Sequence, residues 1–286
     1  MLTYLQGVIL GILQGVTELF PISSLGHSAI VPRLLGWDID QKSPFFLMFL
    51  VATHFATAIV LALFFLKDWI RILKGFFRTI VDRDVLKVNA DGRLAWLLIV
   101  GTIPAGLVGF VFRHFIGDHL LSGIFPEVFL TLNGFLLFGA ELLRRKAPAK
   151  SESDSDARIS RMTWWQGFKV GLMQVLALMP GFSRTGSTIA GSLVVGLSHE
   201  DSVRFSFLLS TPIIAAAGAL EIPKLIASGN ASMIGVSVAG GLSAAVFSYL
   251  SVKFLTGYFK SETRTLAPFA IYCIAAGAAS LIYYLR

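Results

Sequence analysis

Apolar runs of about 20 residues recur along the 286-residue chain, and each is long enough to cross a bilayer as a helix. We predict six membrane-spanning helices at residues 43–66, 94–115, 126–144, 203–222, 232–257 and 266–285. Composition agrees, because 55% of the residues are hydrophobic and only 14% are charged, whereas soluble domains carry about 25% charged residues. The expected class is an all-α polytopic membrane protein with a single membrane domain over residues 1–286.

The formal net charge of +7 is concentrated in a few loops. Lysine and arginine gather at 67–93, 144–161 and 253–264, whereas 116–125 and 223–231 carry only Lys224 between them. Loops rich in Lys and Arg stay on the cytoplasmic side. We therefore place the first three loops in the cytoplasm and the other two outside, and this explains the positive charge without a nucleic-acid partner.

Two stretches are apolar but do not fit as full spans. Residues 3–20 end at Pro21 and the following 24–36 is too short to cross, while 164–179 and 186–197 repeat this pattern around Pro180. If each pair enters the membrane and returns to the same side, the six spans agree with the charge rule. We therefore predict two re-entrant helix pairs, 3–36 entering from outside and 164–197 entering from the cytoplasm.

The two broken stretches also resemble each other. GILQ at 11–14 matches GLMQ at 171–174, and PISSLGHS at 21–28 matches PGFSRTGS at 180–187. A weaker match joins GTIPAG at 101–106 to TLAPFA at 265–270. Opposed entry sides together with a repeat indicate an inverted-topology fold whose broken helices meet near the midplane. The first repeat would span 1–145 and the second 162–286.

The second break carries an arginine in an apolar setting. Non-helical backbone at membrane depth is tolerated only beside protein or a water-filled cavity, so we expect the two breaks to meet. Ser23 or Ser24 can cap the helix after the first break, and Ser183 or Thr185 the helix after the second. Helix N-termini attract anions, and the planar fork of Arg184 suits a phosphate or diphosphate. The alternative for Arg184 is a structural ion pair.

The first break carries groups that can transfer protons. Gln14 and Glu18 lie four residues apart on one helix face, and a carboxylate in an apolar helix is costly unless it is paired or hydrated. His27 lies one turn into the next short helix and suits proton transfer or nucleophilic attack; its alternative is a structural, hydrogen-bonded histidine. His54, in the middle of a span, is expected mainly to pack or to form a hydrogen bond.

The stretches GVTELFPISSLGHS (15–28) and PGFSRTGST (180–188) resemble the two motif regions of the bacitracin-resistance type undecaprenyl-pyrophosphate phosphatases. The resemblance covers nearly the whole chain. It implies a multi-pass enzyme of the bacterial inner membrane that hydrolyses undecaprenyl pyrophosphate to undecaprenyl phosphate and phosphate. That reaction recycles the lipid carrier of peptidoglycan and envelope glycans and confers bacitracin resistance. The family fold has six spans and two re-entrant pairs in inverted repeats, with the active site open to the periplasmic side.

The resemblance also assigns roles to residues. It implies catalytic roles for Glu18, Ser24, His27 and Arg184, and phosphate binding by Ser23, Gly26, Gly181, Ser183, Arg184, Thr185, Gly186 and Thr188. A divalent cation, Mg²⁺ or Ca²⁺, would be held at Gln14 and Glu18. The family commonly has glutamate where this chain has Gln14, so one negative charge is missing from that pair.

Two questions stay open at the level of sequence. Either Ser24 attacks the terminal phosphorus with His27 as its base, or His27 attacks and forms a phosphohistidine. The chain would take polyprenyl pyrophosphate and membrane lipids as partners, and its oligomeric state is not determined. An alternative function is a polyprenyl-phosphate flippase or transporter that uses the same midplane site.

Overall fold

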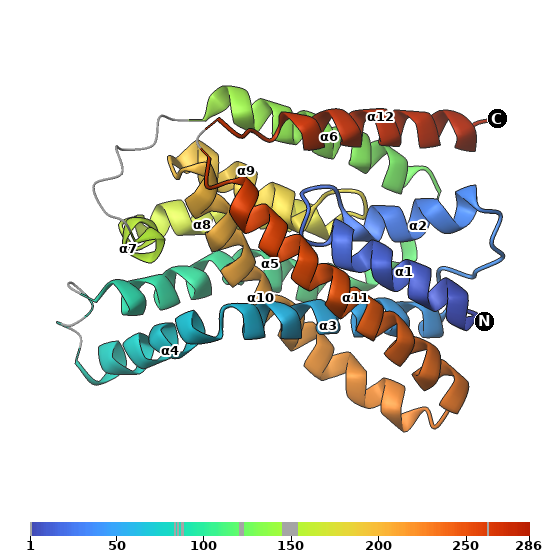
Figure 1. The fold of residues 1–286 in the computed structure, drawn as a ribbon, viewed down its shortest axis with the longest axis horizontal. Helices are drawn as coiled ribbons and strands as arrows, with labels where there is room; N and C mark the ends of the chain where they lie inside the picture. Colours follow the sequence, from blue (N-terminus) through green and yellow to red (C-terminus); the bar gives the residue numbers. More distant parts are fainter. Residues whose placement is uncertain are drawn as a thin grey trace.

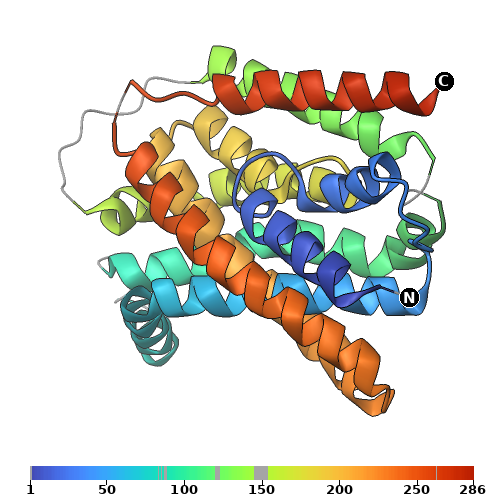
Figure 2. The ribbon, with the colours of Figure 1, turned by 45° about the vertical axis from the view of Figure 1, so that its right-hand side comes forward.

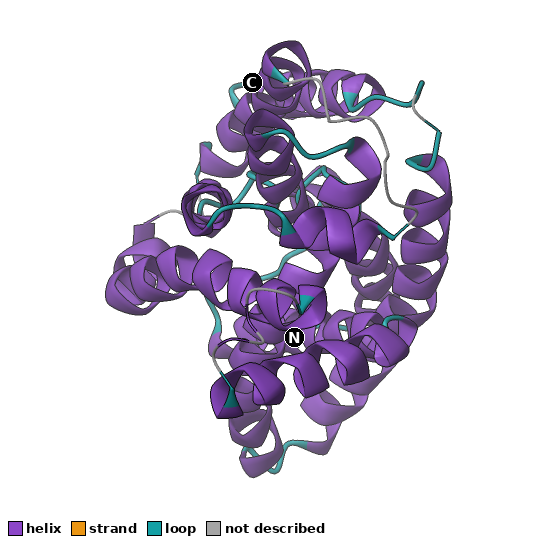
Figure 3. Ribbon diagram, turned by 90° about the vertical axis from the view of Figure 1, so that its left-hand side faces the viewer, coloured by secondary structure: helices purple, strands orange, loops and turns teal. Residues whose placement is uncertain are grey.

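The computed structural model describes residues 2–82, 84, 86, 89–119, 123–144, 154–261 and 263–286, with the side chains of 113–119 left out. Within these ranges the chain forms helices and connecting turns, and no β-strand (Figure 3). The helices are α1 Tyr4–Thr17, α2 Ser24–Leu34, α3 Pro44–Phe64, α4 Leu66–Val81, α5 Ala90–His119, α6 Phe125–Leu143, α7 Ser155–Ser160, α8 Trp164–Gln174, the 3₁₀ helix η2 Val175–Leu178, α9 Arg184–Val195, α10 His199–Ala227, α11 Ala231–Tyr258 and α12 Ala267–Tyr284.

Six helices of the described chain are long and apolar enough to cross a membrane. They are α3, the segment Ala90–Phe112 of α5, α6, α10, α11 and α12. Their bounds lie at most five residues from those predicted from the apolar runs. The prediction of an all-α chain with six candidate spans is therefore confirmed.

One helix lies where we expected only a basic loop. The region 67–93 contains α4, a 16-residue helix that follows α3 after a single residue. Trp69, Ile72, Leu73 and Phe76 recur at helical spacing along it, between the basic residues. The expectation of a loop was wrong because the high charge of this stretch hid an amphipathic helix whose apolar face packs on α5.

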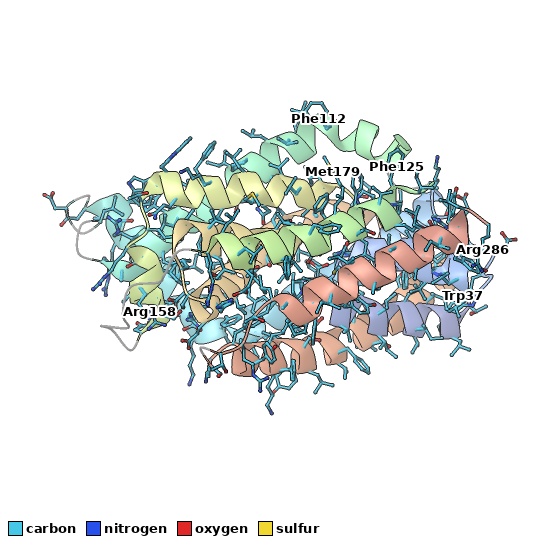
Figure 4. All side chains as sticks on the ribbon, turned by 90° about the horizontal axis from the view of Figure 1, so that it is seen from above. Trp37, Phe112, Phe125, Arg158, Met179 and Arg286 are labelled. Carbon is cyan, nitrogen blue, oxygen red and sulfur yellow. The ribbon has the colours of Figure 1, made fainter. Side chains whose placement is uncertain are left out.

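Helices α1, α2, α8 and α9 lie among the longer helices (Figures 1 and 2). Helix α1 packs along α11 and α8 along α5, while α6 pairs with α12 and contacts both α2 and α9. Figure 4 shows Trp37, Phe125 and Arg286 at one end of the molecule and Arg158 at the other. The breaks between α1 and α2 and between η2 and α9 are thus enclosed by helices.

Close contacts at two glycines set the positions of α1 and α8, the helices that precede the two breaks. A Cβ added to Gly11 of α1 would lie 2.1 Å from the carbonyl oxygen of Gly240 in α11. A Cβ added to Gly171 of α8 would lie 2.5 Å from the carbonyl oxygen of Gly101 in α5. Small residues at such crossings let helix backbones approach closely. The matched tetrapeptides GILQ and GLMQ therefore place α1 and α8 in the same way, each against a long helix.

The end marked by Arg158 is held together by ion pairs. Asp156 of α7 accepts hydrogen bonds from Arg204 of α10 (2.6 Å) and Arg71 of α4 (2.8 Å). The hydrogen-bonded carboxylate of Asp68, with other nearby carboxylates, raises the pKa of the Arg71 guanidinium further above its ordinary value. This network joins α4, α7 and α10 and keeps the basic end of the molecule compact.

Candidate active site

The two breaks use the same cap to begin the helix that follows. Ser23 is the N-cap of α2, where its hydroxyl oxygen accepts a hydrogen bond from the Gly26 amide at 3.2 Å. Ser183 is the N-cap of α9 and accepts from the Gly186 amide at 3.0 Å. Of the two residues considered at each break, Ser23 and Ser183 form the caps. Ser24 and Arg184 are consequently the first residues of their helices.

The two breaks meet at a buried asparagine of α6. The side-chain amide of Asn133 donates to the carbonyl oxygen of Pro21 at 3.0 Å, and its oxygen accepts from the Ser183 amide at 3.0 Å. Close packing adds to this link, since a Cβ on Gly26 would lie 3.0 Å from the Cα of Gly181. The breaks are 160 residues apart in the chain, and Asn133 fixes one against the other.

Glu18, at the C-cap of α1, is the centre of a polar cluster formed by both breaks. Its Oε1 accepts a hydrogen bond from Nη2 of Arg184 at 2.5 Å, so the carboxylate and guanidinium form an ion pair. Its Oε2 accepts from the Ser24 hydroxyl and, at 3.2 Å, from the Gln14 amide. Both charged side chains are largely removed from solvent, and each neutralises the other.

Two members of the cluster come from long helices. His54 of α3 has its Nε2 3.1 Å from Oε2 of Glu18 and 3.3 Å from the Ser24 oxygen. Ser210 of α10 accepts a hydrogen bond from Nη1 of Arg184. The sequence analysis assigned His54 mainly to packing or hydrogen bonding and did not consider Ser210. A lone histidine in the middle of a span was the signal for the first; no local signal marked the second.

His27 lies on a different side of α2's first turn. Its Nδ1 contacts the Ser23 carbonyl oxygen at 2.6 Å and its Nε2 the Tyr272 hydroxyl at 2.8 Å, and the ring stacks on Tyr272. Both ring nitrogens are therefore engaged, Nδ1 within the first turn of α2 and Nε2 across to α12. Among the described contacts His27 does not reach Ser24, and the expected pairing of these two residues is replaced by contacts of Ser24 with Glu18 and His54.

The remaining residues expected to bind phosphate fall into two groups. Thr188 bonds to the Ser206 hydroxyl at 2.6 Å and to the Arg184 carbonyl oxygen at 2.9 Å, and Thr185 donates to the Glu18 carbonyl oxygen at 2.9 Å. These hydroxyls hold α9 in place. Gly181 has a φ of 116°, and a Cβ there would lie 2.5 Å from the Pro126 carbonyl oxygen, so this position requires glycine.

The expected metal ligands do not form the ligand set of a resident cation. Glu18 is the one carboxylate of the pair, and Arg184 already neutralises it. Gln14 turns its NH₂ group toward Glu18, which leaves its own oxygen buried without a hydrogen bond. Within the described residues no three His, Cys, Asp or Glu side chains gather around one point. The residues therefore do not fit a metal ion held by protein atoms alone.

A separate groove of about 480 Å³ lies between α4, α5 and α10. Its lining is almost entirely apolar, with residues such as Trp69, Phe76, Leu98 and Pro212. Among the described residues no charged side chain lines it. The groove therefore lacks the groups that bind a phosphate, and the polar cluster around Glu18 is the candidate active site.

The comparisons with known proteins identify the family of the chain. The family model described as bacitracin resistance protein BacA matches residues 7–279. A protein of Mycolicibacterium paratuberculosis named undecaprenyl-diphosphatase is 45% identical over 99% of this chain and 97% of its own length. Proteins of Burkholderia ambifaria and Frankia alni, each named undecaprenyl-diphosphatase 2, are 43% and 36% identical, over 97% of this chain and 96% of their own lengths. The chain belongs to the bacitracin resistance protein BacA family.

Proposed function

We propose that this protein is a membrane phosphatase that hydrolyses undecaprenyl pyrophosphate to undecaprenyl phosphate and inorganic phosphate. The names of its relatives supply the substrate. The observation that carries the proposal is the contact of Arg184, from the second break, with the Glu18–Ser24 pair of the first. The guanidinium of Arg184, which can bind the diphosphate, and the hydroxyl of Ser24, which can attack phosphorus, are thus adjacent. Recycling of the lipid carrier and bacitracin resistance would follow from this activity.

Arg184 and the N-terminus of α9 bind the diphosphate in this scheme. The guanidinium exchanges its contact with Glu18 for two phosphate oxygens, an arrangement that its planar fork favours. Ser210 keeps hold of Nη1 and so fixes the plane of the fork. The first turn of α9 adds N–H groups without intrahelical partners and the positive end of the helix dipole.

Ser24 is the group best placed to attack. Its hydroxyl already contacts Glu18, and Glu18 contacts Arg184, so a terminal phosphate on Arg184 lies beside the serine oxygen. The Ser24 oxygen forms a bond to phosphorus as the bond to the bridging oxygen breaks, and undecaprenyl phosphate leaves. His27 as the attacking group is less well supported, because its Nε2 contacts Tyr272 and its Nδ1 the backbone.

A divalent cation enters this scheme on the substrate. Because Gln14 and Glu18 do not form a metal site by themselves, we propose that Mg²⁺ or Ca²⁺ binds mainly to diphosphate oxygens, the usual partners of Mg²⁺. Chelation should lower phosphate release, and added Mg²⁺ should restore it. Equilibrium dialysis should find no bound Mg²⁺ without substrate; tight binding to substrate-free protein would contradict this part of the proposal.

We further propose that α1–α2 and α8–α9 are re-entrant pairs of an inverted repeat within one membrane domain. The shared Ser-x-x-Gly caps and the paired glycine crossings of α1 and α8 support it. Element order then relates α5 to α11 and α6 to α12. The match of GTIPAG with TLAPFA joins α5 to α12 instead, and it does not fit this order.

The orientation in the membrane follows from charge. The network around Asp156 and Arg158 lies at the basic end, which we place in the cytoplasm by the positive-inside rule. Helix α2 runs from the candidate site toward the opposite end in Figure 1. We propose that the site opens along this direction to the periplasmic side of a bacterial inner membrane.

The test is phosphate release from a polyprenyl pyrophosphate by purified protein in detergent. Arg184→Gln should lower kcat/KM by about 10²–10³-fold, the usual effect of removing a key donor to developing charge. Arg184→Lys keeps the charge but not the fork and should lose less. Arg78→Gln, at a position on α4 outside the site, is the control. Release by Arg184→Gln at the rate of the unaltered protein would overturn the assignment.

A flippase would behave differently in the same preparation. With Ser24→Ala in liposomes, hydrolysis is expected to stop, so movement of a labelled polyprenyl phosphate between leaflets can be followed alone. The phosphatase proposal predicts no movement above that of protein-free liposomes. Rapid movement together with the absence of phosphate release from the unaltered protein would favour the transporter.

A further inference from the structure

We propose that His54 is a catalytic residue of this site, whose Nε2 takes the proton from the Ser24 hydroxyl during attack. This inference rests on the proposed phosphatase function. The evidence for it is the position of His54 in the structure and not a sequence motif, because His54 lies in the middle of α3, 30 residues after Ser24. Its Nε2 is 3.3 Å from the Ser24 oxygen, within reach for proton transfer.

The backbone of α3 determines which nitrogen of His54 is available. Nδ1 lies 2.7 Å from the Leu50 carbonyl oxygen, one turn earlier in the helix. A carbonyl oxygen only accepts hydrogen bonds, so Nδ1 must carry a hydrogen. In the neutral ring the lone pair is therefore on Nε2, the atom that faces Ser24. A second group that fixes the tautomer of a base is the arrangement expected of a nucleophile–base pair.

Glu18 accepts the hydrogen bond of the Ser24 hydroxyl in the substrate-free site, but it is the weaker base of the two neighbours of Ser24. One of its oxygens is held by Arg184, and an ionised carboxylate beside a guanidinium is a weak proton acceptor. Its other oxygen lies 3.1 Å from Nε2 of His54. Once His54 has taken the proton, the resulting imidazolium forms an ion pair with Glu18. In serine triads the carboxylate stabilises the imidazolium through the other ring nitrogen, whereas here Glu18 would do so at Nε2 itself.

Two charged side chains face the ring of His54, and both of its nitrogens have partners. Among the described contacts, the charged groups that face its ring are Glu18 at the end of α1 and Arg184 of α9. Helices α10 and α11 also pack on α3, where Ser210 of α10 bonds to Arg184 and Ser248 of α11 bonds to Thr57 of α3. The His54 side chain is 17% exposed, so protein atoms do not cover it completely. His27, by contrast, is buried against Tyr272.

Ser24, His54, the leaving phosphate and water account for every proton that moves in the reaction. In the first step the Ser24 oxygen bonds to phosphorus, its proton moves to Nε2 of His54, and the protonated ring gives that proton to the departing lipid phosphate. In the second step water attacks phosphoserine and gives one proton to His54. The Ser24 oxygen leaves phosphorus and takes that proton back, while the other water hydrogen stays on the released phosphate.

The first experiment compares the two histidines of the region. His54→Gln should lower kcat by about 10²–10³-fold with KM changed less than about threefold, because a general base acts in the transition state rather than in binding. His27→Gln should lose less than about tenfold. Thermal unfolding in detergent checks that both variants fold. A kcat for His54→Gln within twofold of the unaltered protein would overturn the inference.

The second experiment separates proton transfer from positioning. Imidazole added to His54→Ala should raise kcat at least tenfold, because it can occupy the vacated space and accept the Ser24 proton; Ser24→Ala should not respond. A large loss in both His54 variants without rescue would make His54 a positioning residue and contradict the inference. If the unaltered protein itself releases no phosphate, the phosphatase proposal fails instead, so the two failures are distinct.

Discussion

The two helix breaks share one backbone solution and carry opposite chemistry. Each has a proline, a serine cap and a glycine whose amide binds that cap. The first break then adds Glu18 and Ser24, whereas the second adds Arg184 and further hydroxyls. The difference teaches that the repeated part of the sequence builds two facing helix ends, while the unrepeated side chains divide the work between them.

The buried charge of each break is neutralised by the opposite charge of the other break. Glu18 and Arg184 form an ion pair across 166 positions of the chain, and removing one partner of a buried pair costs about 3–5 kcal/mol. The pair therefore stabilises the contact between the two breaks, and it also holds Arg184 where its guanidinium can bind an anion. The division of labour predicts that first-break substitutions affect the chemical step and second-break substitutions affect binding.

The largest expected effect comes from the serine of the first break. Ser24→Ala should lower kcat by about 10³-fold or more, since an attacking hydroxyl has no replacement in the cluster. Phosphate release under saturating substrate measures it. Ser28→Ala is the matched control on the same helix, because the Ser28 hydroxyl is buried without a hydrogen bond among the described residues. Equal losses in Ser24→Ala and Ser28→Ala would show that the effect is structural.

A smaller effect should follow when the breaks are separated from each other. Asn133→Ala removes the link between Pro21 and Ser183, leaves the buried Ser183 amide without this partner, and leaves the Pro21 carbonyl oxygen to the weak Cys273 thiol donor. We expect a loss of about 2–4 kcal/mol in stability and of about tenfold or more in kcat/KM as both breaks lose their register. Thermal unfolding and phosphate release measure the two. Unchanged activity at reduced stability would show that the breaks act independently.

The smallest effects should be equal in the two halves. Gly11→Ala and Gly171→Ala each place a methyl group against a neighbouring helix backbone and should cost about 1–3 kcal/mol. Gly257→Ala on α11 meets open space and should be neutral or slightly stabilising. Thermal unfolding measures all three. A large cost in one half only would contradict equivalent packing of α1 and α8.

Much of the fold could be predicted from sequence because the bilayer leaves few solutions. Six apolar runs became six candidate spans, and the Pro-Ser breaks appeared at the expected residues with Ser23 and Ser183 as caps. Helix α4 was missed because its charge masked its apolar periodicity. Local sequence was therefore enough for the spans and the caps, but not for α4.

The candidate site was harder to predict because its contacts are not local. Glu18, Ser24 and Arg184 stand in motifs, and the structure brings them together. Asn133, His54 and Ser210 stand alone in long helices, and nothing near them in sequence indicates that they reach the breaks. His27 stands inside a motif but bonds to Tyr272, which lies 245 residues away.

The division of labour between the breaks is tested most directly by binding without turnover. A methylene-bridged polyprenyl diphosphonate, which cannot be hydrolysed, is titrated into Ser24→Ala and Arg184→Gln in detergent. The account predicts a Kd for Ser24→Ala within about threefold of the unaltered protein, and a Kd for Arg184→Gln weakened by about 10²-fold, equivalent to about 2.7 kcal/mol. Equal weakening in both variants, or tight binding by Arg184→Gln, would contradict it.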